Sequence, residues 1–134
     1  MKKEKLSGLL FLCYLAVLLR ITVFRSGFGT HALFGGAVNA SPFADYAALL
    51  AARRWRSFLY LFFGNVAWFV PLGFVLRRRF HRPPAPALAL GFLLSLCIET
   101  LQFVFATGLS ECGDLILNTC GTLTGWMLGK EKTP

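Results

Sequence analysis

The sequence predicts an all-α integral membrane protein with four transmembrane helices, both termini in the cytoplasm, and a short interfacial helix in the first outer loop. Three observations lead to this fold class. Apolar residues make up 56% of the chain, which exceeds the usual share in soluble domains. Charge is nearly absent from four long runs, and basic residues cluster on alternate sides of those runs. With 134 residues, we expect a single domain over residues 1–134.

A helix needs about 20 mainly apolar residues to cross a bilayer. The apolar runs predict helices at about 6–24, 57–77, 87–107 and 113–129. The first includes Arg20, whose long side chain can reach the interface. The fourth is short, and it needs Asp114 or local thinning of the bilayer. Between the first two helices, SGFGTHALFGGAVNASPF is expected to be irregular, and PFADYAALLAARRWRSF is expected to form the interfacial helix.

The net charge of +8 raises the possibility of nucleic-acid binding, but the positions of the charges indicate topology. Nine basic residues fall on the side that also holds both termini: Lys2, Lys3, Lys5, Arg77, Arg78, Arg79, Arg82, Lys130 and Lys132. The positive-inside rule places that side in the cytoplasm. We therefore expect membrane lipids, with anionic lipid of the inner leaflet among them, as partners in place of nucleic acid.

The four cysteines lack the spacing of a metal or redox site and are interpreted as packing residues. No metal and no cofactor is expected. The histidines have no neighbouring ligands in the sequence and are assigned no role.

Polar residues recur at helical spacing on the last two predicted helices. They are Ser95, Glu99 and Gln102 on the third helix, and Asp114, Asn118, Gly121 and Gly125 on the fourth. Asn65 on the second helix and Asn39 in the outer loop add two amides. The predicted topology places Asn65, Glu99, Gln102, Asp114 and Asn118 in the outer half of the membrane, which favours an outward-facing polar pocket.

Each carboxylate has two interpretations. A charged group at mid-membrane is costly and normally faces a bundle interior or a wet cavity. Asp114, at the start of its helix, is either a helix cap or a pocket residue. Glu99 lies deeper, so capping does not explain it. It is either a residue that holds the helices together, protonated or bonded to Gln102 or Asn118, or a residue that serves the function directly.

Two other features indicate how the helices pack. The sequence from Gly121 to Gly125 is a GxxxG motif, which is typical of close contact between membrane helices. The second helix contains Pro71 and Gly73, and Pro71 is expected to kink it.

Four segments resemble the motifs of the VanZ-like family of small bacterial membrane proteins. They are NASPF (39–43), NVAWFVPLGFVL (65–76), GFLLSLCIETLQ (91–102) and GDLILNTCGTLTGW (113–126). The family commonly carries an Arg and further acids just before its last conserved Asp, where this chain reads TGLSECGD. Glu111 can stand in for one acid, but the Arg is absent there. The resemblance implies a protein of the bacterial plasma membrane in a family named after a teicoplanin-resistance protein, and it implies no known reaction.

Three functions are compatible with these features. In the first, the outer pocket binds a lipid headgroup, a cell-wall precursor or a glycopeptide, with Arg53, Arg54 and Arg56 near the outer interface, and so contributes to teicoplanin resistance. In the second, an intramembrane enzyme acts on a lipid-linked substrate, with Glu99 as general base and Asp114 as a second carboxylate or metal ligand. In the third, Glu99 carries protons in a small transporter, although the chain lacks inverted repeats.

Overall fold

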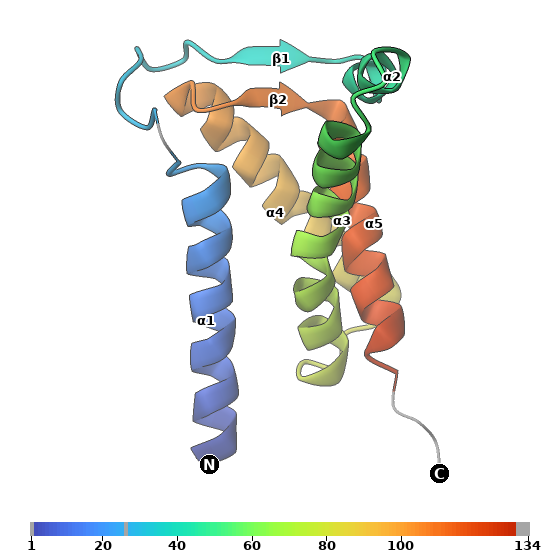
Figure 1. The fold of residues 1–134 in the computed structure, drawn as a ribbon. Helices are drawn as coiled ribbons and strands as arrows, with labels where there is room; N and C mark the ends of the chain where they lie inside the picture. The colour runs from blue at the N-terminus through green and yellow to red at the C-terminus, as the bar shows by residue number, and fades with distance from the viewer. Residues whose placement is uncertain (1, 26, 131–134) are drawn as a thin grey trace.

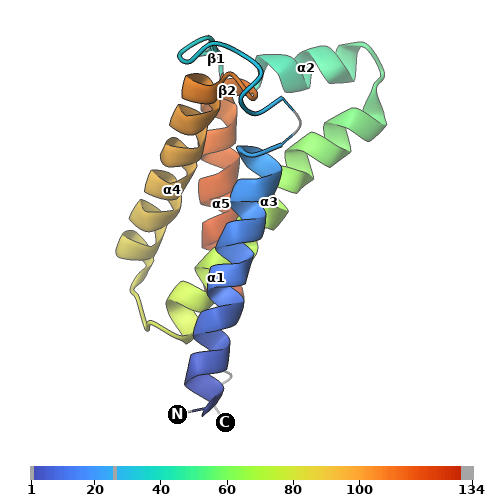
Figure 2. The same ribbon diagram turned by 90° about the vertical axis from the view of Figure 1, so that its left-hand side faces the viewer.

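The computed structural model describes residues 2–25 and 27–130. Its elements, in chain order, are α1 (Lys2–Thr22), β1 (Ala37–Asn39), α2 (Ala44–Ala51), α3 (Trp55–Arg78), α4 (Pro84–Phe105), β2 (Leu109–Glu111) and α5 (Cys112–Leu128). The long helices run roughly alongside one another (Figure 1). The strands and α2 lie at one end of the bundle, called here the strand end, and the α3–α4 loop lies at the other, the loop end (Figures 1 and 2).

Three helices in the described part of the chain are long and apolar enough to cross a membrane. They are α1, α3 and α4, whose apolar stretches have mean hydropathies of 1.7, 1.8 and 2.0, respectively. The predicted helices at about 6–24, 57–77 and 87–107 agree with these elements within a few residues. α5 has 17 residues, so a fourth transmembrane helix stays a prediction. The first turn of α1 and the last turn of α5 both lie at the loop end (Figure 1), while Lys132 lies outside the described residues.

α3 and α5 make the closest contact in the bundle, backbone against backbone. Gly121 and Gly125 of α5 lie against the carbonyl groups of Val66 and Val70 in α3, and Gly73 of α3 lies against the backbone of α5. A Cβ atom at any of these three glycines would overlap the facing backbone. The GxxxG sequence thus lies at the seam between α3 and α5, where small residues let two membrane helices approach.

α4 packs on α5 through small and polar side chains. Thr122 of α5 is 0% exposed and fills the space beside Gly91 of α4. One turn away, the Nδ2 atom of Asn118 donates a hydrogen bond of 2.8 Å to the hydroxyl of buried Ser95. A bond between helices satisfies a polar group that the apolar surroundings would otherwise penalise.

α1 contacts the other helices at few points and exposes much of its apolar surface. Leu18 and Val23 are buried, whereas Leu9, Leu10 and Leu12 are largely exposed. The Tyr14 hydroxyl donates to the carbonyl oxygen of a residue in α3, at 2.6 Å. Exposed leucines on a helix of this length provide the surface that lipid chains solvate.

The all-α prediction is wrong in one respect, because the α1–α2 loop and the α4–α5 connection each contribute one strand of a parallel pair. β1 pairs with β2 in the register Ala37↔Leu109, Val38↔Ser110 and Asn39↔Glu111. The loop reaches this position by crossing the end of α4, where the Gly36 N–H donates to the carbonyl of Phe103 at 3.1 Å. A Cβ atom at Gly36 would lie 2.5 Å from the Phe103 Cα, so the close crossing requires glycine there.

The short helix predicted in the first outer loop is present as α2, which begins after Phe43. Its interfacial location stays a prediction. α3 continues through Pro71 to Arg78, and the kink expected at Pro71 stays a prediction as well.

Substitution of Gly125 by Ala should destabilise the α3–α5 seam, because the added methyl group would overlap the Val70 carbonyl. We expect a loss of about 1–3 kcal/mol in the free energy of unfolding, measured by denaturant titration in detergent micelles. Gly64→Ala is the matched control on α3, where a Cβ atom meets nothing within 4 Å. Equal stability of the two variants would contradict the packing described for the seam.

Candidate functional site

A polar cavity of about 320 Å³ lies at the strand end of the bundle. It is formed where the end of α1, the first half of α3, α2, α4, β2 and the start of α5 meet. Its polar lining consists of Thr22, Arg25, Tyr46, Tyr60, Asn65, Gln102, Glu111 and Asp114. Such a mixture of an apolar wall with a few convergent polar groups is typical of small-ligand sites.

The Tyr46 hydroxyl is the central contact of this cavity. It donates to Oδ1 of Asp114 at 2.7 Å and accepts from Nδ2 of Asn65 at 3.0 Å. Tyr46 is 5% exposed and packs edge-on against the ring of Phe62. Burial, followed by the Asp114 carboxylate, raises the pKa of the Tyr46 hydroxyl. Its two hydrogen bonds tie α2, α3 and α5 together.

Arg25 supplies the positive charge of the cavity. Its Nε atom donates to the carbonyl oxygen of Thr107 at 2.5 Å, and its guanidinium group lies over Gly108, where a Cβ atom would be 2.6 Å from Nη2. Gln102 of α4 donates from Nε2 to the carbonyl of Thr22 at 3.1 Å. These two bonds join the end of α1 to the segment around the end of α4 and hold Arg25 at the same cavity as Glu111 and Asp114.

Glu111 shares a hydrogen bond with Asp45, and the two carboxyl groups retain a proton between them. Burial first, and then the bond to Asp45, raises the pKa of Glu111 to about 8. The bonds from Glu111 and Asn39 lower the pKa of Asp45, and Nδ2 of Asn39 lies 2.9 Å from Oδ2 of Asp45. The pair therefore keeps its shared proton to a higher pH than an isolated carboxyl group would.

The cavity that Arg25 lines is called here the Arg25 cavity, and Glu99 is not among its lining residues. Glu99 is 5% exposed, and its Oε2 atom accepts the backbone N–H of Glu111 at 2.9 Å. The Ser110 hydroxyl donates to the backbone carbonyl of Glu99 at 2.6 Å. Glu99 thus fastens β2 to α4, and it borders a separate, mainly apolar cavity of about 280 Å³ that includes Leu96 and Phe103.

The expectation of one convergent pocket needs correction. The structure brings Asn65, Gln102 and Asp114 to the same cavity, whereas Glu99 borders the neighbouring one. Ser95 and Asn118 pair with each other in the α4–α5 contact, and Asn39 pairs with Asp45 above it. Among the described residues, the Glu99 carboxylate accepts the Glu111 N–H, while Gln102 and Asn118 donate to Thr22 and Ser95.

The interpretation of Asp114 as a helix cap is also corrected. α5 begins at Cys112 and the preceding residue is Glu111, so Asp114 lies inside the first turn. Its carboxylate accepts from Tyr46 across the cavity. The favourable interaction between a negative charge and a helix N-terminus still applies at this position.

Tyr46 and Arg25 are the site residues that sequence reasoning missed. Tyr46 reads as part of the apolar face of a short helix, and Arg25 reads as one of several outer basic residues. Their partners, Asp114 and Thr107, lie 68 and 82 residues away in the chain. One signal in the sequence could have pointed to Arg25. The Arg that the family commonly carries just before its last conserved Asp is missing here, so a positive charge at the site would have to come from another segment of the chain. Within the described residues, no group of three or more His, Cys, Asp and Glu side chains is arranged to hold a metal ion.

These features define a small helical protein with helices apolar enough for a membrane and a polar cavity at one end. The family model of VanZ/LLP1 matches residues 11–130. Protein VanZ of Enterococcus faecium is 31% identical over 125 residues, which cover 90% of this chain and 71% of that protein. The chain therefore belongs to the VanZ/LLP1 family, as its four motifs predict. No solved structure matches it.

Replacement of Tyr46 by Phe should destabilise the protein, because it removes a buried hydroxyl and leaves Asp114 and Asn65 without their shared partner. We expect a loss of about 1–3 kcal/mol in unfolding free energy, measured by denaturant titration in micelles. The control is Tyr60→Phe, since Tyr60 also borders the cavity but is 79% exposed. A Tyr46→Phe protein as stable as Tyr60→Phe would contradict the central role of this hydroxyl.

The raised pKa of Glu111 predicts a specific pH dependence. The ordinary pKa of a glutamate side chain is 4.5, and that of Glu111 in the folded protein is about 8. Between these two pH values the folded protein keeps a proton that the unfolded chain releases. The free energy of unfolding therefore falls as pH rises through this window and then levels off. We expect the difference in unfolding temperature between wild type and Glu111→Gln to show this slope; a difference independent of pH would contradict it.

Proposed function

We propose that this protein is a multi-pass protein of the bacterial plasma membrane that binds an envelope ligand in the Arg25 cavity and thereby contributes to teicoplanin tolerance. The observation that carries the proposal is the cavity itself, which Arg25, Glu111 and Asp114 line beside the Tyr46–Asn65 bond. Membership of the VanZ/LLP1 family supports the envelope setting.

The proposed topology has four transmembrane helices, with α5 as the fourth, and cytoplasmic termini. Support comes from Arg77, Arg78, Arg79 and Arg82 near the α3–α4 loop and from the basic residues at the start of α1, all toward the loop end. The positive-inside rule orients that end toward the cytoplasm. The Arg25 cavity then opens toward the outer face, and α2 lies along the outer interface with Trp55 following it.

The chemistry of the cavity fits a ligand that combines an anionic group with hydroxyl or amide groups. The Arg25 guanidinium can bind a phosphate or carboxylate through paired donors. Asp114 and the Asn65 amide offer acceptors to a sugar hydroxyl or a peptide N–H. A lipid headgroup, a cell-wall precursor and a glycopeptide all present such groups.

The size of the cavity favours the smaller of these ligands. A volume of about 320 Å³ is at the lower end of sites for small molecules. It accommodates a headgroup or one sugar of a lipid-linked cell-wall precursor, whereas a whole glycopeptide would contact it through a single substituent.

The enzyme and transporter alternatives both rely on Glu99. Its carboxylate accepts a backbone N–H and lies outside the Arg25 cavity. This arrangement is typical of a structural clamp, and we therefore prefer binding to either alternative. Turnover of envelope lipids by the purified protein, or drug efflux coupled to proton uptake in liposomes, would reverse that preference.

The test uses a host whose teicoplanin tolerance depends on this protein. Arg25→Gln and Asp114→Asn should each weaken ligand binding about tenfold, since each removes a hydrogen bond that involves a charge. Tolerance should fall in parallel, measured as the lowest inhibitory concentration. A lipid or cell-wall precursor that co-purifies with wild type, detected by mass spectrometry, should be lost in Arg25→Gln.

Arg53→Gln is the matched control, because Arg53 lines a different hollow at the α2–α3 corner. Membrane abundance and unfolding temperature are measured for every variant. If Arg25→Gln and Asp114→Asn both keep full tolerance while folded and abundant, the cavity does not carry the function.

A further inference from the structure

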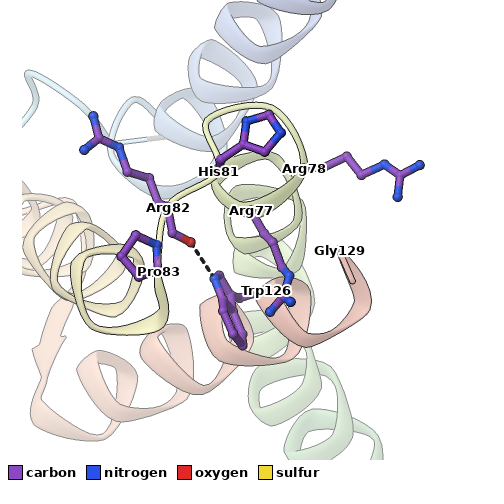
Figure 3. Close-up of a pocket in the computed structure, with 7 residues that line it drawn as sticks. All are labelled: Arg77, Arg78, His81, Arg82, Pro83, Trp126 and Gly129. Carbon is purple, nitrogen blue, oxygen red and sulfur yellow. Dashed lines mark hydrogen bonds between the residues drawn. The ribbon is translucent and has the colours of Figure 1, made fainter. Parts of the chain in front are cut away.

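A second cavity, of about 410 Å³, lies at the loop end and is strongly basic. It is lined by Arg77, Arg78, His81, Arg82, Pro83, Trp126 and Gly129 (Figure 3). No acidic side chain is among these lining residues. The Arg25 cavity is at the opposite end of the same bundle, so the two sites are distinct.

The interior of this basic cavity is built around an arginine and an indole ring. The guanidinium carbon of Arg77 lies 3.8 Å from the ring centroid of Trp126, a stacking geometry that orients the flat guanidinium group. Nη1 of Arg77 is buried and has no hydrogen-bond partner in the described protein. A buried donor without an acceptor is unfavourable, and an anion that entered beside Arg77 could accept a bond from this group after a small shift.

The loop that bounds the cavity is fixed by hydrogen bonds. Nε1 of Trp126 donates to the carbonyl oxygen of Arg82 at 2.9 Å, which fastens the loop to α5. The Arg82 N–H donates to the carbonyl of Leu76 at 2.9 Å, and the His81 N–H donates to that of Arg77 at 3.1 Å. In Figure 3, Arg77 points in beside Trp126, while the side chains of Arg78 and Arg82 extend outward on opposite sides.

We propose that this cavity binds the phosphate group of an anionic membrane lipid, such as phosphatidylglycerol or cardiolipin. Arginine binds phosphate through paired donors, and three arginines border the cavity, with Arg77 pointing into it. It lies where α3 ends and α4 begins, which is the level of lipid headgroups if these helices cross a bilayer. Basic pockets between membrane helices on the cytoplasmic side are suited to such headgroups.

A free phosphate ion shares this chemistry, but the surroundings favour a lipid. Trp126 provides an apolar ring of the kind that is enriched at the membrane interface. Exposed Phe80 precedes His81 in the same loop, and Met127 and Leu128 are exposed at the end of α5. A phosphate at the mouth of the cavity would therefore have apolar surface beside it for acyl chains.

The test measures lipid selectivity of the full-length protein in nanodiscs by native mass spectrometry. Wild type should retain phosphatidylglycerol in preference to phosphatidylcholine. Arg78→Gln/Arg82→Gln should reduce that preference roughly tenfold, since each basic residue near the surface favours anionic lipid severalfold. Arg77→Gln should act in the same direction, and its unfolding temperature in pure phosphatidylcholine shows whether it folds.

The control is Arg53→Gln/Arg56→Gln, which removes the same charge at the α2–α3 corner. Its preference should stay within about twofold of wild type. Equal losses in the two double variants would mean that net charge alone attracts the lipid, and unchanged selectivity in Arg78→Gln/Arg82→Gln would equally overturn the site. A thermal shift with millimolar inorganic phosphate as large as that with short-chain phosphatidylglycerol would assign the cavity to a free anion.

Discussion

The backbone contact between α3 and α5 is the constraint on which the rest of the structure depends. Gly73, Gly121 and Gly125 allow the two helices to approach until side chains no longer separate them. The contact fixes the distance between Asn65 and Asp114 at one end, so a single Tyr46 hydroxyl bonds to both. At the other end the same seam places Arg77 beside Trp126. The positions of both cavities therefore depend on the contact between α3 and α5.

Charge is divided between the ends of the bundle in a way that suits a membrane. The strand end combines the Arg25 guanidinium with the carboxyl groups of Asp45, Glu111 and Asp114, so both basic and acidic groups occur there. The basic cavity at the loop end has no acidic lining residue. With the proposed topology, the first arrangement suits a ligand of mixed chemistry on the outer side, and the second suits an anionic surface on the inner side.

Helical periodicity made much of this fold predictable. Long apolar runs define α1, α3 and α4, and the spacing of Gly121 and Gly125 places them on one face of α5. The strand pair was not predictable, because three residues carry too little pattern to indicate a strand. Its position depends on Gly36 crossing Phe103 and on Glu99 binding the Glu111 N–H, which are contacts between distant parts of the chain.

The buried carboxylate of Glu99 gains a structural explanation from that strand pair. β2 is three residues long, too short to hold its place by strand pairing alone. Glu99 binds its last N–H, and the Ser110 hydroxyl binds the Glu99 carbonyl. Glu111, fixed in this way, turns its side chain toward Asp45 and the Arg25 cavity. Glu99 therefore acts on the candidate site indirectly, as the residue that positions Glu111.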